Sequence, residues 1–156
     1  DADADRVSSI EEAIEEDELV LRCSELNDEI IALQKKIAEA MNSKMQLHVY
    51  RQDKEYFLYL DEIIFVETSE QIVAVHTKDQ IYETKQRLYE LEELLPGNFM
   101  RVSKSTIVNT SKIRAIHKNI TGASELEFTN TAKKAYASRT LIKSLITKLE
   151  EKRLKK

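Results

Sequence analysis

Short runs of apolar and β-branched residues follow one another at close spacing from Gln46 to Ala137, and this spacing constrains the fold more than any other feature. Brief alternating runs separated by polar turns are typical of β-strands rather than helices. The runs expected to form strands are 46–51, 56–60, 63–66, 72–76, 81–84, 99–102, 106–109, 113–117, 124–128 and 132–137. Because neighbouring runs are joined by short turns, such as 52–54, the pattern predicts a β-meander.

Two segments of this region have helical periodicity instead. A helix predicted over 85–95 carries leucines on one face and ends at Pro96-Gly97. Ser138 is expected to cap a closing helix, whose apolar side comprises Leu141, Ile142, Leu145, Ile146 and Leu149. Residues 45–156 are therefore predicted to form one mainly β domain with a few helices.

Residues 1–44 are predicted to be an acidic N-terminal extension with an amphipathic helix. Apolar residues recur there at steps of three and four, at Leu19, Cys23, Leu26, Ile30, Leu33, Ile37 and Ala40. One interpretation is a single helix whose heptad stripe pairs two copies of the chain in a parallel coiled coil. The other is a short strand over 18–23, followed by a helix that starts at Ser24 or Asn27 and ends near Ser43. Either helix needs a partner for its apolar face, which is a second copy or its own domain.

The length of 156 residues suits one domain with a short extension. No run of eighteen apolar residues occurs, and the start of the chain lacks the basic and apolar regions of a signal peptide, so a cytoplasmic protein is expected. The single cysteine, Cys23, has no second cysteine for a disulfide or a zinc site. We expect it to be a small buried residue.

Charge is distributed unevenly along the chain. The net charge is −4, but residues 1–44 carry 13 acidic and 5 basic side chains, and residues 45–99 carry 11 and 5. Residues 100–156 carry 4 acidic and 14 basic side chains, a net charge of +10. A basic segment on an acidic chain is typical of a surface that binds phosphate groups. The charge pattern therefore favours a nucleic-acid partner.

Catalysis is not expected. His48, His76 and His117 lie on separate predicted strands without the spacing of metal ligands. No glycine-rich phosphate loop, nucleophile elbow or catalytic pair of carboxylates occurs, and the chain has only two glycines. The sequence predicts no enzyme, no cofactor, no metal site and no small-molecule substrate, and favours a binding module on a β scaffold.

Four segments resemble signatures of the LytTR family of bacterial transcription regulators. Phe99–Asn109 has an aromatic residue, an arginine, two serines flanking a lysine, and an apolar strand that ends in asparagine. The other three are Tyr136–Arg139, Leu60–Glu67 and Tyr82–Glu92. They occur in the order and spacing of the family, and the resemblance extends from about Leu47 to Leu149.

The resemblance implies an elongated, mostly antiparallel β fold, similar to a sandwich, that binds double-stranded DNA through loops instead of a recognition helix. Loops of the family enter two successive major grooves and the minor groove between them. By position, the DNA-binding residues expected here are Ser69, Gln71, Ser103, Lys104, Ser105, Ser138, Arg139 and Thr140, with Lys143 adding attraction for phosphate. Many relatives have a second arginine where this chain has Thr140, so Arg139 is the stronger candidate of the two.

Physical arguments support two of these residues independently. Lys104 lies between two apolar strands, and its ammonium must face solvent because a buried unpaired charge is costly. It can reach guanine O6 and N7, or only a phosphate. Arg139 is expected at a helix N-terminus, where phosphate is well accommodated. Arg101 is interpreted as a structural ion-pair partner of Glu67 or Glu83.

The resemblance also implies a homodimer in which each domain reads one half of a repeat operator. Most relatives carry a phosphoryl-accepting receiver domain, for which the 44 residues before this domain are too short. Stand-alone relatives often lie beside a small membrane protein that restrains them, so a membrane regulatory protein is a further expected partner.

Two alternative functions remain open. Tyr56, Phe57, Tyr59, Phe65, Phe99 and Phe128 are expected in the core, but an exposed set would instead form a base-stacking face. That arrangement is typical of a single-stranded nucleic-acid or RNA-binding module. In the second alternative, the protein acts as an assembly module through its N-terminal helix.

Overall fold

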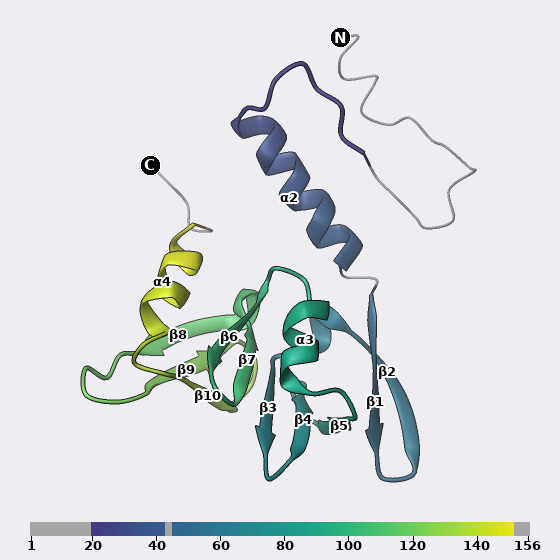
Figure 1. Ribbon diagram of the computed structural model, residues 1–156, viewed down its shortest axis with the longest axis vertical. Helices are drawn as coiled ribbons and strands as arrows, with labels where there is room; N and C mark the ends of the chain where they lie inside the picture. The colour runs from purple at the N-terminus through teal and green to yellow at the C-terminus, as the bar shows by residue number, and fades with distance from the viewer. Residues whose placement is uncertain (1–19, 43–44, 152–156) are drawn as a thin grey trace. The chain divides into compact units, whose positions relative to one another are not determined.

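The computed structural model describes residues 20–42 and 45–151. These residues belong to two compact units, 1–43 and 44–156 along the chain, and each unit is described by itself. The described part of the first unit contains one helix, α2 (Asp28–Asn42). The second unit is a β domain with two α-helices, α3 (Leu88–Leu94) and α4 (Ile142–Glu150), and the short 3-10 helices η1 (Leu60–Glu62) and η2 (Thr110–Lys112) (Figure 1).

The larger sheet of the domain has seven antiparallel strands in the order β2-β1-β5-β4-β3-β7-β6. Their bounds are β1 (Gln46–Arg51), β2 (Lys54–Tyr59), β3 (Phe65–Ser69), β4 (Ile72–His76), β5 (Ile81–Thr84), β6 (Phe99–Ser103) and β7 (Thr106–Asn109). Strands β3 and β7 are far apart in sequence but pair directly, with Val66 opposite Ile107. Because this pair is antiparallel, the turns of the β3–β4 and β6–β7 hairpins lie at the same end of the strands.

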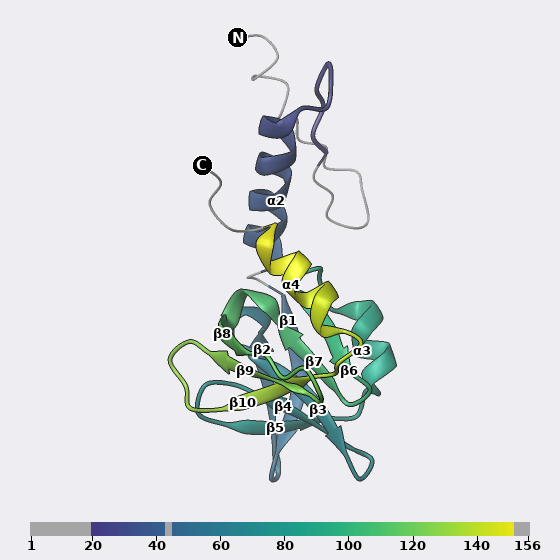
Figure 2. The same cartoon turned by 90° about the vertical axis from the view of Figure 1, so that its left-hand side faces the viewer.

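A smaller antiparallel sheet has the order β10-β9-β8 and consists of β8 (Ile113–His117), β9 (Ser124–Phe128) and β10 (Lys134–Ala137). Figure 2 shows it in front of the larger sheet, on the side where β10 contacts β6 and β7. Helix α4 packs beside it, and the completely buried side chain of Leu145 anchors that helix.

Two hydrophobic cores lie on opposite faces of the larger sheet. Alternate side chains of one strand point to opposite faces, so β3 places Val66 in the first core and Phe65 in the second. Leu88 and Leu91 of α3 close the first core. The smaller sheet and α4 close the second core with side chains that include Leu126, Phe128, Ala135 and Leu145. The domain is therefore layered as α3, the large sheet, and the small sheet with α4.

The mainly β, antiparallel architecture predicted from the sequence is confirmed. Each of the ten predicted runs contains an observed strand or overlaps one, and six coincide with the observed bounds. The largest difference lies near η1, where the run predicted at 63–66 gives way to a strand over Phe65–Ser69. Polar residues therefore extend β3 up to its turn, because backbone pairing with β4 continues to Ser69.

The first interpretation of the N-terminal segment is wrong, and the second is wrong in its strand but right in its helix, which Asn27 caps and which ends at Asn42. Residues 20–27 are neither helix nor strand, so neither a single helix from Leu19 nor a strand over 18–23 is observed among the described residues. The helix begins at Asp28 because the Asn27 side chain accepts a hydrogen bond from the Ile30 N–H at 3.0 Å. Cys23 therefore lies before the helix and is exposed, not buried. Residues 1–19, including Leu19, lie outside the described residues.

Two further predictions are wrong in part. Phe65, Phe99 and Phe128 are buried as expected, but Phe57 and Tyr59 are 59% and 47% exposed, because β2 is an edge strand and their face of it is uncovered. Helix α4 begins at Ile142 rather than directly after Ser138. The residues between them form a turn, in which the Ser138 carbonyl accepts hydrogen bonds from the N–H groups of Leu141 and Ile142.

Candidate nucleic-acid interface

The first predicted DNA-contacting segment is the tip of the β3–β4 hairpin, which points away from α3 and α4 in Figure 1. Ser69 and Ile72 are the last paired residues, so the loop contains only Glu70 and Gln71. Both have positive φ, 51° and 69°, as in the tight type I′ turns of hairpins. Ser69, Glu70 and Gln71 are all exposed. The hairpin therefore presents a short polar tip on a rigid pair of strands.

The second segment is the β6–β7 turn. Ser103 pairs with Thr106, which leaves Lys104 and Ser105 as the turn residues. The Ser103 hydroxyl accepts a hydrogen bond from the Ser105 N–H at 3.2 Å and lies 3.4 Å from the Ser105 hydroxyl. Ser103 and Ser105 thus contribute to building the turn, while Lys104 projects from it and is exposed.

The third segment is the turn between β10 and α4. The hydroxyls of Ser138 and Thr140 lie 3.2 Å apart, and Ser138 Oγ also accepts a hydrogen bond from the Leu141 N–H. Arg139 is exposed between them, in the turn and not at the first residues of the helix. Lys143 is exposed in the first turn of α4. The chain therefore offers two cations here, one in the turn and one at the start of α4.

Backbone hydrogen bonds join the three segments. The Thr68 N–H donates to the Ser105 carbonyl at 2.8 Å, which fixes the first turn beside the second. The Ser138 N–H donates to the Val102 carbonyl at 2.7 Å, which fixes the third turn beside the second. We refer to residues 69–71, 103–105 and 138–140 together as the turn cluster. Its three parts come from distant positions in the sequence and are held together at one end of the domain.

The basic residues of the C-terminal third do not all lie in or beside the turn cluster. Lys134 pairs with Glu125 at 3.1 Å on the small sheet, and this hydrogen bond raises the pKa of Lys134. The Lys133 ammonium donates to the Gln80 carbonyl at 2.8 Å, and burial lowers its pKa. By contrast, no hydrogen bond or ion pair joins the charged groups of Lys104, Arg139 and Lys143 to another described residue. These three cations are available to a ligand.

Arg101 and Asn109 have structural roles that the sequence showed only in part. Arg101 is a structural residue as expected, but its carboxylate partner is Glu92 of α3, at 3.3 Å, and not Glu67 or Glu83. Asn109 is completely buried and donates from Nδ2 to the Ile63 carbonyl at 2.9 Å. This bond ties the end of β7 to the chain before β3, which explains an asparagine at the end of that strand.

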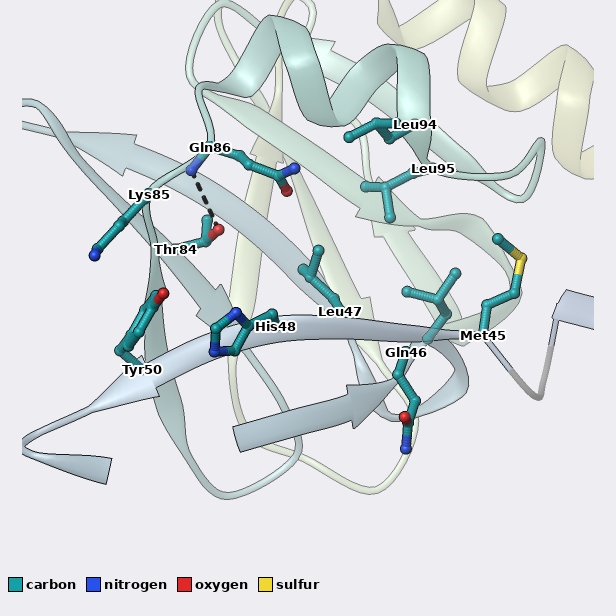
Figure 3. A pocket seen from close by; sticks show the side chains of 11 residues that line it. Met45, Gln46, Leu47, His48, Tyr50, Thr84, Lys85, Gln86, Leu94 and Leu95 are labelled. Atoms are coloured by element: carbon teal, nitrogen blue, oxygen red, sulfur yellow. Dashed lines mark hydrogen bonds between the residues drawn. The ribbon is translucent and has the colours of Figure 1, made fainter. Parts of the chain in front are cut away.

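A pocket of about 380 Å³ lies elsewhere in the domain, between β1 and the end of α3 (Figure 3). Its apolar side includes Leu47 and Leu95, and its polar side includes His48 and Lys85. None of its lining residues belongs to the turn cluster. No group of three side chains suited to a metal ion occurs in residues 20–42 or 45–151. No helix in the described part of the chain has the length and hydrophobicity to cross a bilayer.

A layered β domain that carries free cations and hydroxyls on adjacent turns has the features of a binding domain that uses loops on a rigid scaffold. The family follows from comparison with known sequences. The chain belongs to the LytTR family, because the model of the LytTr DNA-binding domain matches residues 53–150. The family resemblance seen in the sequence is thereby confirmed, and this family is a DNA-binding one, not a catalytic one.

Two similar proteins are uncharacterized HTH-type transcriptional regulators of Staphylococcus aureus, from strains bovine RF122 / ET3-1 and MRSA252. Each is 34% identical over 98 residues, which is 62% of this chain and 66% of the relative. A solved LytTr DNA-binding domain of a methyl-accepting/DNA response regulator from Bacillus cereus has a similar fold, with a TM-score of 0.61 and 24% identity. That match covers 69% of this chain and 97% of the solved domain.

The term HTH-type describes those Staphylococcus proteins and does not match the described helices of this chain. A helix-turn-helix unit needs two helices joined by a turn of a few residues. Strands separate α2, α3 and α4 from one another along the sequence. The described residues therefore contain no helix-turn-helix unit.

Proposed function

We propose that residues 45–151 bind double-stranded DNA in a sequence-specific manner through the turn cluster. The observation that carries this proposal is the pair of backbone hydrogen bonds, Thr68 to Ser105 and Ser138 to Val102, that hold three turns side by side, two of which carry a free cation. Loops fixed on strands keep their side chains in defined directions, as base recognition requires. Membership of a DNA-binding family supports the same ligand.

Within this proposal, Lys104 and Arg139 contact base edges, and Lys143 contacts a phosphate. Lysine and arginine donate to guanine O6 and N7 in the major groove, which is the commonest specific contact to DNA. Hydroxyls such as those of Ser69 and Thr140 contact phosphates or bases at shorter range, and the amide of Gln71 is suited to adenine. The turn cluster would then enter major grooves, with its three turns spread along the duplex.

We also propose that the protein regulates transcription as a homodimer on a repeat operator. The S. aureus relatives are described as transcriptional regulators, which supports the function. Helix α2 supports the dimer, because Ile30, Leu33 and Ile37 follow the spacing of a helix–helix contact. A dimer places two turn clusters on one duplex, and its half-site spacing would follow from its symmetry.

The test begins with selection of duplexes from a random library by the full chain. Binding of a selected duplex is then compared with binding of a scrambled duplex of equal length. Lys104→Ala and Arg139→Ala are each expected to weaken the selected duplex by about 1–3 kcal/mol, the usual value of one base contact, and the scrambled duplex much less. Fluorescence anisotropy at fixed salt measures both, because the affinity depends strongly on salt.

Matched control variants are Lys134→Ala and Arg114→Ala, since both residues are exposed on the small sheet and not in the turn cluster. Each control should change the affinity for the selected duplex by less than about twofold, the range of surface substitutions away from an interface. Binding that is unchanged in both turn-cluster variants, or weakened equally by the controls, would contradict the assignment of the interface.

A second candidate, single-stranded nucleic-acid binding, is favoured by the outer face of the β1–β2 hairpin. Phe57 and Tyr59 are exposed there, and the His48 ring stacks on Phe57 with centroids 4.8 Å apart. Such aromatic side chains are suited to stacking on unpaired bases. Strong competition by an unrelated single strand against the selected duplex would support this face as the binding site and contradict the duplex proposal.

A further inference from the structure

Arg101 lies on β6 just before the Lys104 turn and has three polar contacts, all within the protein. Its Nε donates to the Ser103 carbonyl at 3.1 Å, and one terminal nitrogen donates to the Lys104 carbonyl. The other terminal nitrogen lies 3.3 Å from the Glu92 carboxylate of α3. The side chain is 27% exposed. Arg101 therefore bridges helix α3 and the backbone of the turn that carries Lys104.

The backbone at this point is irregular. The pairing of β6 with β7 shifts between Arg101 and Ser103, so that Val102 is an additional residue in β6. Bulges of this kind change the direction of a strand and its side chains. The Val102 carbonyl accepts the Ser138 N–H, so the bulge is also the point where the second and third turns meet. A residue that fixes this backbone sets the direction of Lys104.

Only arginine has the geometry for all three contacts. Its guanidinium is planar and presents five N–H groups in a fixed fork, so it can donate to two carbonyls and a carboxylate together. A lysine has one nitrogen at the end of a flexible chain and cannot reach three acceptors in these directions. The carbonyl of Lys104 lies in the turn, outside the β6–β7 ladder, so Arg101 supplies a donor that the sheet does not.

We propose that Arg101 is a positioning residue for DNA recognition, which holds the backbone of the β6–β7 turn so that Lys104 is directed at its base. This inference rests on the proposed function of the turn cluster and goes beyond it. Arg101 acts through Lys104 and does not contact DNA itself. Its loss should therefore lower discrimination between sequences, while general attraction for DNA remains.

The experiment uses the full chain with the variants Arg101→Lys, Lys104→Ala and the double variant, and the selected and scrambled duplexes as probes. Arg101→Lys retains the positive charge, and we expect it to weaken the selected duplex about tenfold and the scrambled duplex by less than about twofold. Because Arg101 acts through Lys104, the double variant should bind like Lys104→Ala alone, which is the signature of two residues that share one effect.

Two further variants separate positioning from general stability. Glu92→Gln removes the ion pair but leaves both carbonyl contacts of Arg101, so discrimination should remain within about twofold of the original. Arg114→Lys on β8 is the matched control for the change from arginine to lysine. If Arg101→Lys lowers the melting temperature strongly, Arg101→Gln replaces it in the same double-variant comparison.

Three outcomes overturn the inference. If the losses of Arg101→Lys and Lys104→Ala add in the double variant, Arg101 acts independently of Lys104, while the proposed function stands. If Arg101→Gln, which lacks the charge, weakens both duplexes alike and reduces the salt slope by about one, Arg101 contacts a phosphate directly. If Lys104→Ala binds like the original chain, the proposed role of the turn itself fails, and the role of Arg101 fails with it.

Discussion

His76 is the histidine whose protonation is most strongly affected by its surroundings among the described residues. Burial, followed by the nearby charge of Lys133, lowers its pKa to about 4. The ring stacks on Phe65 with centroids 4.2 Å apart, and its Nδ1 has no hydrogen-bond partner among the described residues. Glu67 lies 3.3 Å from Nε2 and favours the charged form, but its side chain is 44% exposed, so water weakens that attraction.

This pKa predicts a loss of stability in acid. In the unfolded chain the imidazole has its usual pKa near 6.5, so it takes up a proton below that pH. In the folded chain it takes up this proton only near pH 4, so protonation between these values favours the unfolded state. The contribution of His76 to the free energy of unfolding should therefore be complete above pH 6.5. It should be lost progressively as the pH falls from 6.5 to 4. Since one pKa unit corresponds to about 1.4 kcal/mol, the fall should approach roughly 3 kcal/mol.

Urea denaturation at several pH values measures this loss. His76→Phe keeps an aromatic ring against Phe65 and removes the titrating group, so its stability should vary less between pH 6.5 and 4. His117→Phe is a suitable control, because His117 is exposed on β8. The same pH dependence in His76→Phe as in the original chain would show that other groups cause the acid instability.

At the scale of elements, α2 is the part of the molecule that most needs a partner. It has 15 residues, a length at which an isolated helix is only marginally stable in water. Leu33 is 37% exposed, and Ile30 and Ile37, which share its side of the helix, are only partly buried. Pairing of α2 with a second copy would bury this apolar surface and stabilise both helices.

Leu33→Glu is therefore expected to weaken the dimer at least tenfold, because it places a charge in the apolar stripe. Analytical ultracentrifugation over a range of protein concentrations measures the change. Ala32→Glu introduces the same charge at an exposed position on the other side of the helix and should leave dimerisation nearly unchanged. If deletion of residues 1–44 leaves the protein as dimeric as before, α2 is not the dimerising element.

At the scale of the whole molecule, the two cores depend on the same sheet. Strand β3 contributes Val66 to one core and Phe65 to the other, and β7 contributes Ile107 and Val108 in the same way. Loss of packing on one face therefore disturbs the strands that support the other. We expect residues 45–151 to unfold in a single cooperative transition, as small domains usually do.

Leu91→Ala under α3 and Leu126→Ala in the small sheet test this coupling, because both side chains are completely buried, each in a different core. Each should lower the free energy of unfolding by about 2–5 kcal/mol through the cavity it leaves. Tyrosine fluorescence and far-UV circular dichroism should report the same denaturation midpoint in each variant. Two separate transitions in either variant would show that the cores unfold independently.

The sequence by itself determined the elements of this domain and its class. Short apolar runs, many of them alternating, marked most of the strands, because side chains of a strand alternate between two faces and this period is local. The predicted start of the last helix was less accurate, since the Ser138 turn depends on side-chain hydrogen bonds that several nearby residues can make, whereas Asn27 was correctly among the predicted caps of α2. The family resemblance carried by the segments around Arg101 and Arg139 also came from the sequence, and the match over residues 53–150 confirms the family.

Only the tertiary structure decided which of these elements meet. The pairing of β3 with β7, the hydrogen bonds that gather the turn cluster, and the contact of Arg101 with Glu92 all join residues distant in sequence. The exposure of Phe57 and Tyr59 depends equally on β2 lying at the sheet edge. Local periodicity is set within a few residues, whereas such contacts depend on how the cores of the whole domain pack.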